Sequence, residues 1–478
     1  MTAANHTAKA ARPAGPAEEF EREPVPPRAL KDWRSFLGMY AGEHVAGTEF
    51  MIGSLFLASG VSAFDLLVGL LVGNLLAVLS WTFVCAPIAT KIRLTLYYKL
   101  EKICGPKMVV IYNLANGVLF CFLAGAMVTV SATAVGVPLN LKMPGLTDWV
   151  PNSLAWIVTV GAVGAIIVLV AAWGYDSVAR VANVAAPWMI LIFLACGIVS
   201  LPALGVHSLG DFWQVAKEKI WPGGDPLPGQ TKFTFWHVVF FAWFCNAAMH
   251  MGMSDLSIFR YAKKWRYGLC SAAGMYIGHY MAWISASMLY AIQLSQSGWA
   301  PGSGQSPPPI APGPMAYQAV GVAGLLCVIV AGWTTANPTI YRAGLAFQAI
   351  FPKSSRFKVT LLAGAVATAA GIFPALAMKL LDFVGLYGTI LMPMGAVIFA
   401  DFYILPRLGL AQDYAEKRRL PLNWAAGAAW LLALLFCLLL NRLAGVQIYF
   451  LALPGWLMAG ILYVLFSLAA QRREGPAA

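Results

Sequence analysis

The stretch Gly-Glu-His-Val-Ala-Gly-Thr-Glu at positions 42–49 lies inside the first long apolar segment of the chain, which runs from Phe36 to Gly60. An ionisable side chain in hydrocarbon costs at least about 2.5 kcal/mol, so such residues face a cavity, a partner or a pathway. Glu43, His44 and Glu49 stand here among glycines, which predicts a helix with a weak middle and free peptide groups. Interrupted helices near the bilayer centre form the substrate and ion sites of many secondary transporters.

The composition of the whole chain predicts an all-α polytopic membrane protein. Of its 478 residues, 60% are hydrophobic and 11% are charged, whereas a soluble protein has about 25% charged residues. The apolar runs approach the roughly 20 residues that cross a bilayer as a helix, and they are too continuous for a β-barrel. The net charge of +12 is spread over short loops, so we expect no nucleic-acid partner. The eight cysteines stand singly, which predicts neither a metal cluster nor a disulfide framework.

Twelve spans are expected along the chain, and the positive charges orient them. The predicted spans are 33–58, 65–88, 108–136, 152–172, 181–205, 233–259, 268–295, 316–349, 357–378, 380–405, 423–441 and 447–470. With the N-terminus inside, the inner loops hold 17 Lys and Arg residues, and the outer connections hold about six. The positive-inside rule therefore predicts a multi-pass protein of the cell (inner) membrane with both termini in the cytoplasm. Residues 1–32 are expected to form a disordered cytoplasmic tail, because they lack an apolar core.

Two spans carry the candidate substrate residues. In the first, Glu49 is expected to bind a polar substrate group or to take up a proton; the alternative is a neutral carboxyl at a kink. Glu43 and His44 lie nearer the cytoplasmic half, where a gating ion pair is an alternative to ligand contact. In the sixth, Asn246, His250 and Ser254 recur every four residues and are expected on one helical stripe.

Aromatic and charged neighbours complete this sixth-span hypothesis. Trp243 or Phe244 would stack on a planar polar ligand, the alternative being packing against neighbouring helices. Asp255 and Arg260 are expected to form a structural ion pair at the end of the span.

The eighth span carries a candidate Na⁺ site. Ala331, Thr334 and Thr335 stand at i, i+3 and i+4, so one carbonyl and two hydroxyls share a helical face. Hard cations take five or more oxygen ligands, and carbonyls of an opened first helix would complete the shell. The alternative is that each Thr bonds back to its own helix.

Several stretches resemble cytosine permeases and hydantoin transporters of the nucleobase:cation symporter-1 family. They are Gly-Trp-Thr-Thr-Ala-Asn-Pro-Thr-Ile-Tyr-Arg-Ala-Gly-Leu at 332–345, Ser-Ala-Phe-Asp at 62–65 and Pro-Met-Gly-Ala-Val-Ile-Phe-Ala-Asp-Phe-Tyr at 393–403. The resemblance implies a five-plus-five inverted repeat with broken helices 1 and 6, two peripheral helices and alternating access. The repeats would be 33–205 and 206–405, followed by peripheral helices and a tail at 406–478.

The same resemblance implies site residues. The cation site falls on Ala331, Thr334 and Thr335, together with carbonyls near Ala41 and His44. The substrate would lie between aromatics of the third and sixth helices, where the matching positions are Phe120 and Asn246. Asn337 of the 332–345 motif is a further substrate-binding candidate.

The expected function is cation-coupled symport of a nucleobase or related nitrogen heterocycle, with Na⁺ or H⁺ as coupling ion. The alternatives are a carrier of a small polar or cationic solute that is proton-coupled through Glu49, or a channel or receptor. No enzyme motif such as HExxH, GxSxG or GxGxxG occurs, so neither an enzyme nor an organic cofactor is expected. The expected partners are the small-molecule substrate and the lipid bilayer, and the transport unit is expected to be a monomer.

Overall fold

The computed structural model describes residues 19–145, 148–300 and 305–473, and in these ranges it contains helices and no strand. Twelve helical units follow one another along the described chain at the positions of the twelve predicted spans, and eight helices of the described residues are long and apolar enough to cross a membrane. The twelve units are α1 with α2 (Trp33–His44, Glu49–Ala58), α3 with α4 (Ala63–Ser80, Ala86–Ile92), α6 (Pro106–Gly136), α7 (Leu154–Ala172), α8 (Tyr175–Ala203), α10 to α12 (Phe235–Phe244, Ala247–His250, Leu256–Phe259), η5 with α13 (Ala273–Tyr280, Met281–Gln296), α15 (Val322–Ile350), α16 (Arg356–Gly371), α18 (Leu380–Phe399), α20 (Trp424–Ala444) and α21 (Ala452–Arg473). The prediction of an all-α polytopic membrane protein is confirmed.

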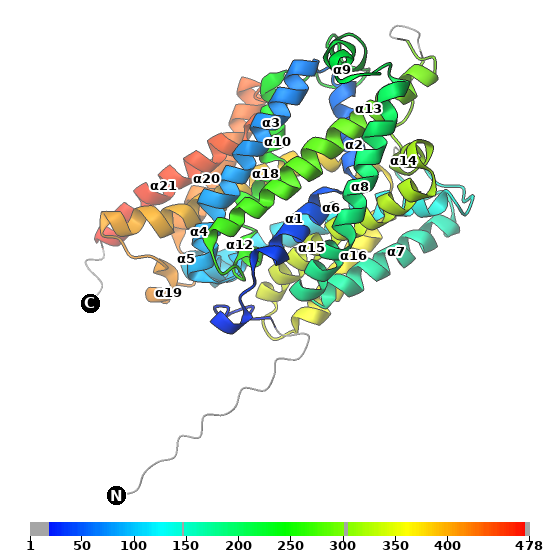
Figure 1. Cartoon of the computed structure of the whole chain (residues 1–478). Helices are drawn as coiled ribbons and strands as arrows, with labels where there is room; N and C mark the ends of the chain where they lie inside the picture. Colours follow the sequence, from blue (N-terminus) through cyan, green and yellow to red (C-terminus); the bar gives the residue numbers. More distant parts are fainter. Residues whose placement is uncertain (1–18, 146–147, 301–304, 474–478) are drawn as a thin grey trace, which may run out of the picture.

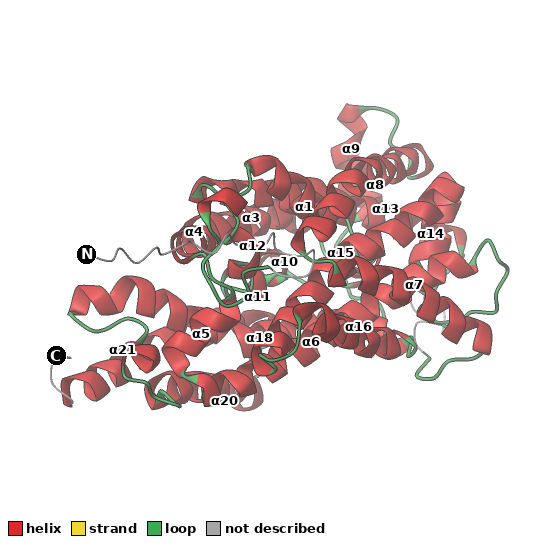
Figure 2. Ribbon diagram, turned by 90° about the horizontal axis from the view of Figure 1, so that it is seen from below, coloured by secondary structure: helices red, strands yellow, loops and turns green. Residues whose placement is uncertain are grey.

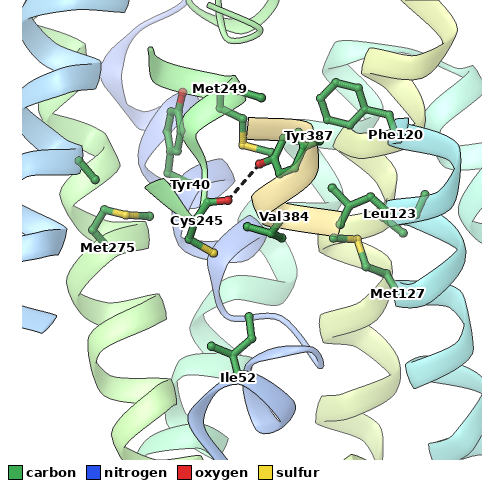
Figure 3. Packing of buried hydrophobic residues seen from close by; sticks show 14 of the residues in the cluster. Tyr40, Ile52, Phe120, Leu123, Met127, Cys245, Met249, Met275, Val384 and Tyr387 are labelled. Carbon is green, nitrogen blue, oxygen red and sulfur yellow. Dashed lines mark hydrogen bonds between the residues drawn. The ribbon is translucent and has the colours of Figure 1, made fainter. Parts of the chain in front are cut away.

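The first span is interrupted where the sequence predicts it. Helix α1 ends at His44, and α2 begins at Glu49. Gly47 lies in the connecting turn, where an added Cβ would come within 3.1 Å of the Val328 carbonyl oxygen and of Val130. A residue with a side chain would therefore separate the turn from α6 and α15. The loss of helical coil between Tyr40 and Ile52 is visible in Figure 3.

The sixth span is also interrupted, and more extensively than a single kink. A non-helical residue follows α10 at Asn246, and the chain between α11 and α12 turns through Met253, whose φ is +68°. Because the helix does not continue, Asn246, His250 and Ser254 do not form one continuous helical stripe. That prediction is wrong, since a four-residue spacing predicts a shared face only where the helix is unbroken.

Packing between the spans follows a two-fold pattern that relates spans one to five with spans six to ten. The first span packs on the seventh (α2 on α13), and the sixth packs on the second (α10 on α3). The first also packs on the fifth (α1 on α8), and the sixth packs on the tenth (α11 on α18). The third and eighth spans, α6 and α15, cross each other at the centre. Each contact is matched by its counterpart five spans later, as the five-plus-five repeat requires.

Short helices lie at the two ends of the bundle (Figure 1), and Figure 2 shows the described chain as helices joined by loops. Helix α9 (Leu209–Val215) lies at one end, and α5 (Leu96–Cys104) and α19 (Tyr414–Lys417) lie at the other. After α9, the loop 221–233 returns over the end of α2. There Leu227 donates its backbone N–H to the carbonyl of Ala58 at 2.7 Å, and Phe233 donates to Ser59 at 3.0 Å. The loop and α2 are therefore joined through their backbones.

Residues 19–32, here called the N-terminal strap, lie against the end of the bundle opposite α9 (Figure 1). Val25 is buried and donates its N–H to the carbonyl of Arg93 at 3.1 Å. Lys31 donates its N–H to the carbonyl of Tyr261 at 2.6 Å. The predicted disordered tail is therefore wrong for these residues, because polar and backbone bonds hold a segment that lacks an apolar core. Residues 1–18 of that prediction lie outside the described ranges.

Candidate functional site

A cavity of about 40 Å³ lies where the two broken helices meet α6, α15 and α18. Its lining is Glu43, His44, Thr48, Glu49, Ile52, Leu123, Met127, Cys245, Asn246, Met249, His279, Thr335, Thr339, Val384 and Tyr387. Figure 3 shows the apolar part of this wall, where the Tyr387 hydroxyl donates to the Cys245 carbonyl at 3.0 Å. Apolar walls with a few convergent polar groups are typical of small-molecule sites.

Glu49 is the acidic group of this cavity. It is the first residue of α2, and 4% of its surface is exposed. The positive end of the helix dipole favours a negative charge at this position. One carboxylate oxygen accepts a hydrogen bond from the indole Nε1 of Trp283, and the other lies 4.0 Å from Nε2 of His279. The seventh span therefore supplies both polar neighbours of the carboxylate.

Two histidines stand beside Glu49 and pack ring to ring. His44 and His279 meet edge to face at 4.9 Å between centroids, and His279 stacks on Trp283 at 4.1 Å. Nδ1 of His44 lies 2.8 Å from the carbonyl oxygen of Tyr40. A carbonyl only accepts, so Nδ1 carries the hydrogen and Nε2 of the neutral ring is a free lone pair. The predicted cation ligand near His44 is a backbone carbonyl, which stays a prediction; the His44 side chain lies in this aromatic cluster.

An ion network closes the space between the cavity and the strap end of the bundle. Arg342 of α15 donates to both carboxylate oxygens of Glu43, at 2.6 and 3.3 Å, and to Asp255 at 2.7 Å. Tyr40 and Trp81 donate to the other oxygen of Asp255 at 2.6 and 2.7 Å. The network joins the broken ends of spans one and six to span eight. It agrees with the gating alternative for Glu43.

The predicted ion pair between Asp255 and Arg260 is wrong. Arg260 points to the strap, where it donates to the carbonyls of Phe20 at 2.7 Å and Glu19 at 3.1 Å. Asp255 turns the opposite way, into the bundle, because the chain breaks just before α12. Proximity in sequence predicted a pair, whereas the helix break separates the two side chains.

The candidate Na⁺ ligands of span eight lie against the first helix. The hydroxyls of Thr334 and Thr335 lie 3.1 and 3.0 Å from the Ala331 carbonyl oxygen, as in helix back-bonding. Thr335 also donates to the carbonyl of Glu43 at 2.8 Å. The first-helix oxygen that meets span eight is thus that of Glu43. The carbonyl of Ala41 accepts from the N–H of Val45 at 3.1 Å. Sodium binding here stays a prediction.

The predicted substrate residues are distributed over the cavity and its surroundings. Asn246 lines the cavity, and among the described residues its Nδ2 has no hydrogen-bond partner. Phe120 lies behind the cavity wall, 6.1 Å between ring centroids from Tyr387 (Figure 3). Trp243 stacks on Phe244 at 4.4 Å. Neither Trp243 nor Phe244 lines the cavity, so both rings agree with the alternative of packing against neighbouring helices.

The remaining two predicted residues lie outside the cavity lining. His250 is bonded through Nε2 to the carbonyl of Trp243 at 2.9 Å and packs on Trp81 at 4.7 Å. Asn337 is buried in α15, and neither of its amide atoms has a partner among the described residues.

Reasoning from the sequence missed the contributions of the seventh and tenth spans and two residues of the eighth. The missed residues are His279, Trp283, Thr339, Arg342 and Tyr387. Arg342 carried a signal, since a charged residue inside an apolar span, eight positions before its end at Ile350, requires a partner. His279 carried the same signal. Tyr387 and Trp283 carried none, because aromatic residues are common in spans.

Comparisons with known proteins bear on the fold. The sequence matches no protein-family model and no curated protein. The structure is similar to that of Mhp1, a nucleobase-cation-symport-1 family transporter in a closed conformation with bromovinylhydantoin bound. The TM-score is 0.68 at 16% identity, over 95% of this chain and 96% of that chain.

Two further solved structures are similar. A Na⁺-coupled sialic acid symporter in a substrate-bound outward-open state has a TM-score of 0.61 at 13% identity, over 91% of this chain and 89% of that chain. MhsT in complex with L-phenylalanine has a TM-score of 0.54 at 15% identity, over 91% and 98%. The chain therefore shares, over nearly its whole length, the fold of a nucleobase-cation-symport-1 family transporter.

Proposed function

We propose that the protein is a secondary active transporter that carries a small neutral nitrogen heterocycle together with a cation. The observation that supports this most directly is the buried carboxylate of Glu49, which faces a closed cavity at the break of the first helix. Such a group is expensive to hold in a membrane unless a substrate or an ion uses it. The shared fold with cation-coupled symporters agrees with this use.

The polar groups of the cavity favour a flat ligand with neighbouring N–H and C=O groups. Glu49 offers carboxyl oxygens, which accept hydrogen bonds from N–H donors of the ligand. Asn246 offers an amide nitrogen without a partner, suited to a ligand carbonyl. Tyr387 provides aromatic surface. A cyclic amide or imide, such as the hydantoin named with Mhp1, meets these requirements.

Transport requires the cavity to enlarge. Its volume of about 40 Å³ holds a few water molecules, whereas pockets that bind small molecules measure roughly 300–1,000 Å³. We infer that the structure is an occluded state. Rigid movement of the broken helices would open the cavity first at one end of the bundle and then at the other. By the positive-inside rule, the strap end would face the cytoplasm.

Counterflow in proteoliposomes tests the proposal. Vesicles are loaded with unlabelled heterocycle and diluted into a trace of labelled compound, using purines, pyrimidines and hydantoins in turn, with amines as the cationic comparison. A carrier concentrates label transiently, because its site returns occupied. A channel cannot do so. Absence of counterflow for every compound would contradict the proposal, and counterflow restricted to amines would favour the alternative of a cationic solute.

Binding gives the residue-level prediction. Glu49→Ala removes carboxyl hydrogen bonds worth about 0.5–1.5 kcal/mol each, so affinity for the transported heterocycle should fall about 2- to 10-fold for each bond lost. The measurement is the ligand-induced rise in melting temperature of the purified protein. Glu218→Ala, at an exposed residue outside the bundle, is the matched control and should bind as the wild type does. Equal affinity of both variants would exclude Glu49 from the site.

A further inference from the structure

Beside Glu49, the described part of the chain holds two buried histidines that substrate binding does not use. His44 and His279 are each 2% exposed. They come from spans one and seven, and both line the cavity. Nε2 of His44 and Nδ1 of His279 have no hydrogen-bond partner among the described residues. Buried polar atoms without partners are rare in stable proteins, so these two nitrogens call for a function.

Close backbone packing holds the two rings together. An added Cβ at Gly274 would lie 2.6 Å from Nδ1 of His44, and one at Gly278 would lie 2.6 Å from its carbonyl oxygen. The glycines therefore allow the seventh span to approach the end of α1. The result is a row of three proton-binding groups: Glu49, then His279 at 4.0 Å, then His44 at 4.9 Å between ring centroids.

The 4.0 Å gap between Nε2 of His279 and the Glu49 oxygen exceeds a direct hydrogen bond. The adjoining cavity of about 40 Å³ is large enough for water. A water molecule with these two partners would transmit a proton between them. Through this water, His279 can accept a proton that Glu49 releases.

Other titratable groups face this row from every packed element. Arg342 is bonded to two carboxylates, and Tyr40 donates to Asp255. Tyr387 donates to a carbonyl. None of these groups supplies a positive charge to Glu49, so Glu49 and the histidines can gain a proton without displacing an existing cation.

We propose that the coupling ion is a proton held by Glu49 and passed through His279 and His44; this inference rests on the proposed function. In the state open toward α9, water delivers one proton to the Glu49 carboxylate, an O–H bond forms and the site becomes neutral. In the state open toward the strap, that O–H bond breaks and the proton moves through water to Nε2 of His279. His279 then releases a proton from Nδ1 to the free lone pair on Nε2 of His44, and that new N–H bond breaks again when His44 gives the proton to water at the strap end. One proton enters and one leaves for each neutral substrate.

The Thr pair of span eight is less suited to the coupling ion. The Ala331 carbonyl and both hydroxyls already bond one another, and Thr334 also contacts the sulfur of Met189 at 3.6 Å. Na⁺ prefers hard oxygen ligands, as other hard cations do. The protonated carboxyl of Glu49 needs no such shell.

The test measures proton movement with the full-length protein in sodium-free proteoliposomes that contain a pH-sensitive dye. Adding the heterocycle identified by counterflow should acidify the lumen, and a protonophore should abolish accumulation. In His279→Gln and Glu49→Gln, both signals should fall at least tenfold, whereas counterflow through His279→Gln should stay within about twofold of wild type. His237→Gln is the control, because that ring bonds Thr234 and Gln447 away from the cavity.

The possible failures are distinguishable. Accumulation that requires Na⁺ and survives the protonophore would overturn the proton inference while leaving the transporter intact. Accumulation by His279→Gln equal to wild type would overturn the role of that histidine. Absence of wild-type counterflow would instead contradict the proposed function. Proton movement is measured first in the wild type. That measurement alone decides whether the coupling ion is a proton, even if a variant does not fold.

Discussion

At the scale of single residues, Arg342 has the most demanding position in the molecule. It is fully buried, and two carboxylates, Glu43 and Asp255, share its one guanidinium. Removing one partner of a buried ion pair leaves an uncompensated charge and costs about 3–5 kcal/mol. The consequences of removing the arginine and of removing one acid are therefore unequal.

Arg342→Gln should lower the free energy of unfolding by about 3–5 kcal/mol, because two carboxylates then lie unpaired at membrane depth. Glu43→Gln should cost less than half as much, since Arg342 keeps Asp255. The measurement is denaturant unfolding of the purified protein in detergent micelles.

Arg22→Gln is the control for this series. Its partner Glu101 lies 3.7 Å away, and the Arg22 side chain is 40% exposed. Exposed pairs contribute roughly 0–1 kcal/mol, so this variant should unfold almost as the wild type does. If Arg342→Gln were as stable as Arg22→Gln, the network would not hold the broken helices together.

At the scale of elements, the contact between α2 and α13 sets the position of Glu49. Gly53 makes this contact possible, because an added Cβ would collide with the carbonyl oxygen of Trp283 and come within 2.7 Å of Ala286. Gly161, in the middle of α7, has nothing within 4 Å of an added Cβ. Substituting each glycine by alanine therefore distinguishes the effect of packing, at Gly53, from the effect of helix propensity, at Gly161.

Gly53→Ala should destabilise the protein by about 1–3 kcal/mol through overpacking and should reduce uptake, since it moves Glu49 relative to Trp283 and His279. Gly161→Ala should be neutral or stabilising by up to about 1 kcal/mol, the difference in helix propensity. Melting temperature and counterflow, measured on both variants, check this. Equal behaviour of the pair would show that α2 and α13 can separate freely.

The break in the first helix could be predicted, because its causes are local: glycines and ionisable groups within eight residues. The partners of Glu49 could not. Trp283 is 234 positions away in the sequence, and only the fold brings the first and seventh spans together. The stripe at Asn246 and His250 failed for a related reason. A periodicity is read on the assumption of an unbroken helix, and the interruption there depends on packing between the repeats.

At the scale of the whole molecule, the N-terminal strap connects helices that the proposed alternating access would separate. The carboxylate of Glu19 accepts from the N–H of Tyr175 at 2.5 Å and from the hydroxyl of Tyr341 at 2.8 Å, and it lies 3.7 Å from Arg356. These three residues belong to spans five, eight and nine, while Arg260 of span six holds the backbone of the strap. Opening the strap end therefore requires some of these bonds to break.

Glu19→Ala should favour the state that is open at the strap end. Each lost hydrogen bond is worth about 0.5–1.5 kcal/mol, so the open population should rise about tenfold. A cysteine at Asn113, which is buried in α6 between the strap end and the cavity, should then react with a thiol reagent about tenfold faster. Glu23→Ala, at an exposed position of the strap, should leave the rate unchanged. Equal rates would mean that the strap does not restrain opening.

The joint between loop 221–233 and the end of α2 has a consequence for how the molecule can be handled. The loop is bonded to Ala58 and Ser59 through its own peptide groups, so it cannot shift without carrying the upper half of the first helix along. An antibody fragment that binds this loop would therefore slow the proposed transport cycle. A fluorophore attached to the loop would report movements of α2 from outside the bilayer, although α2 itself is buried.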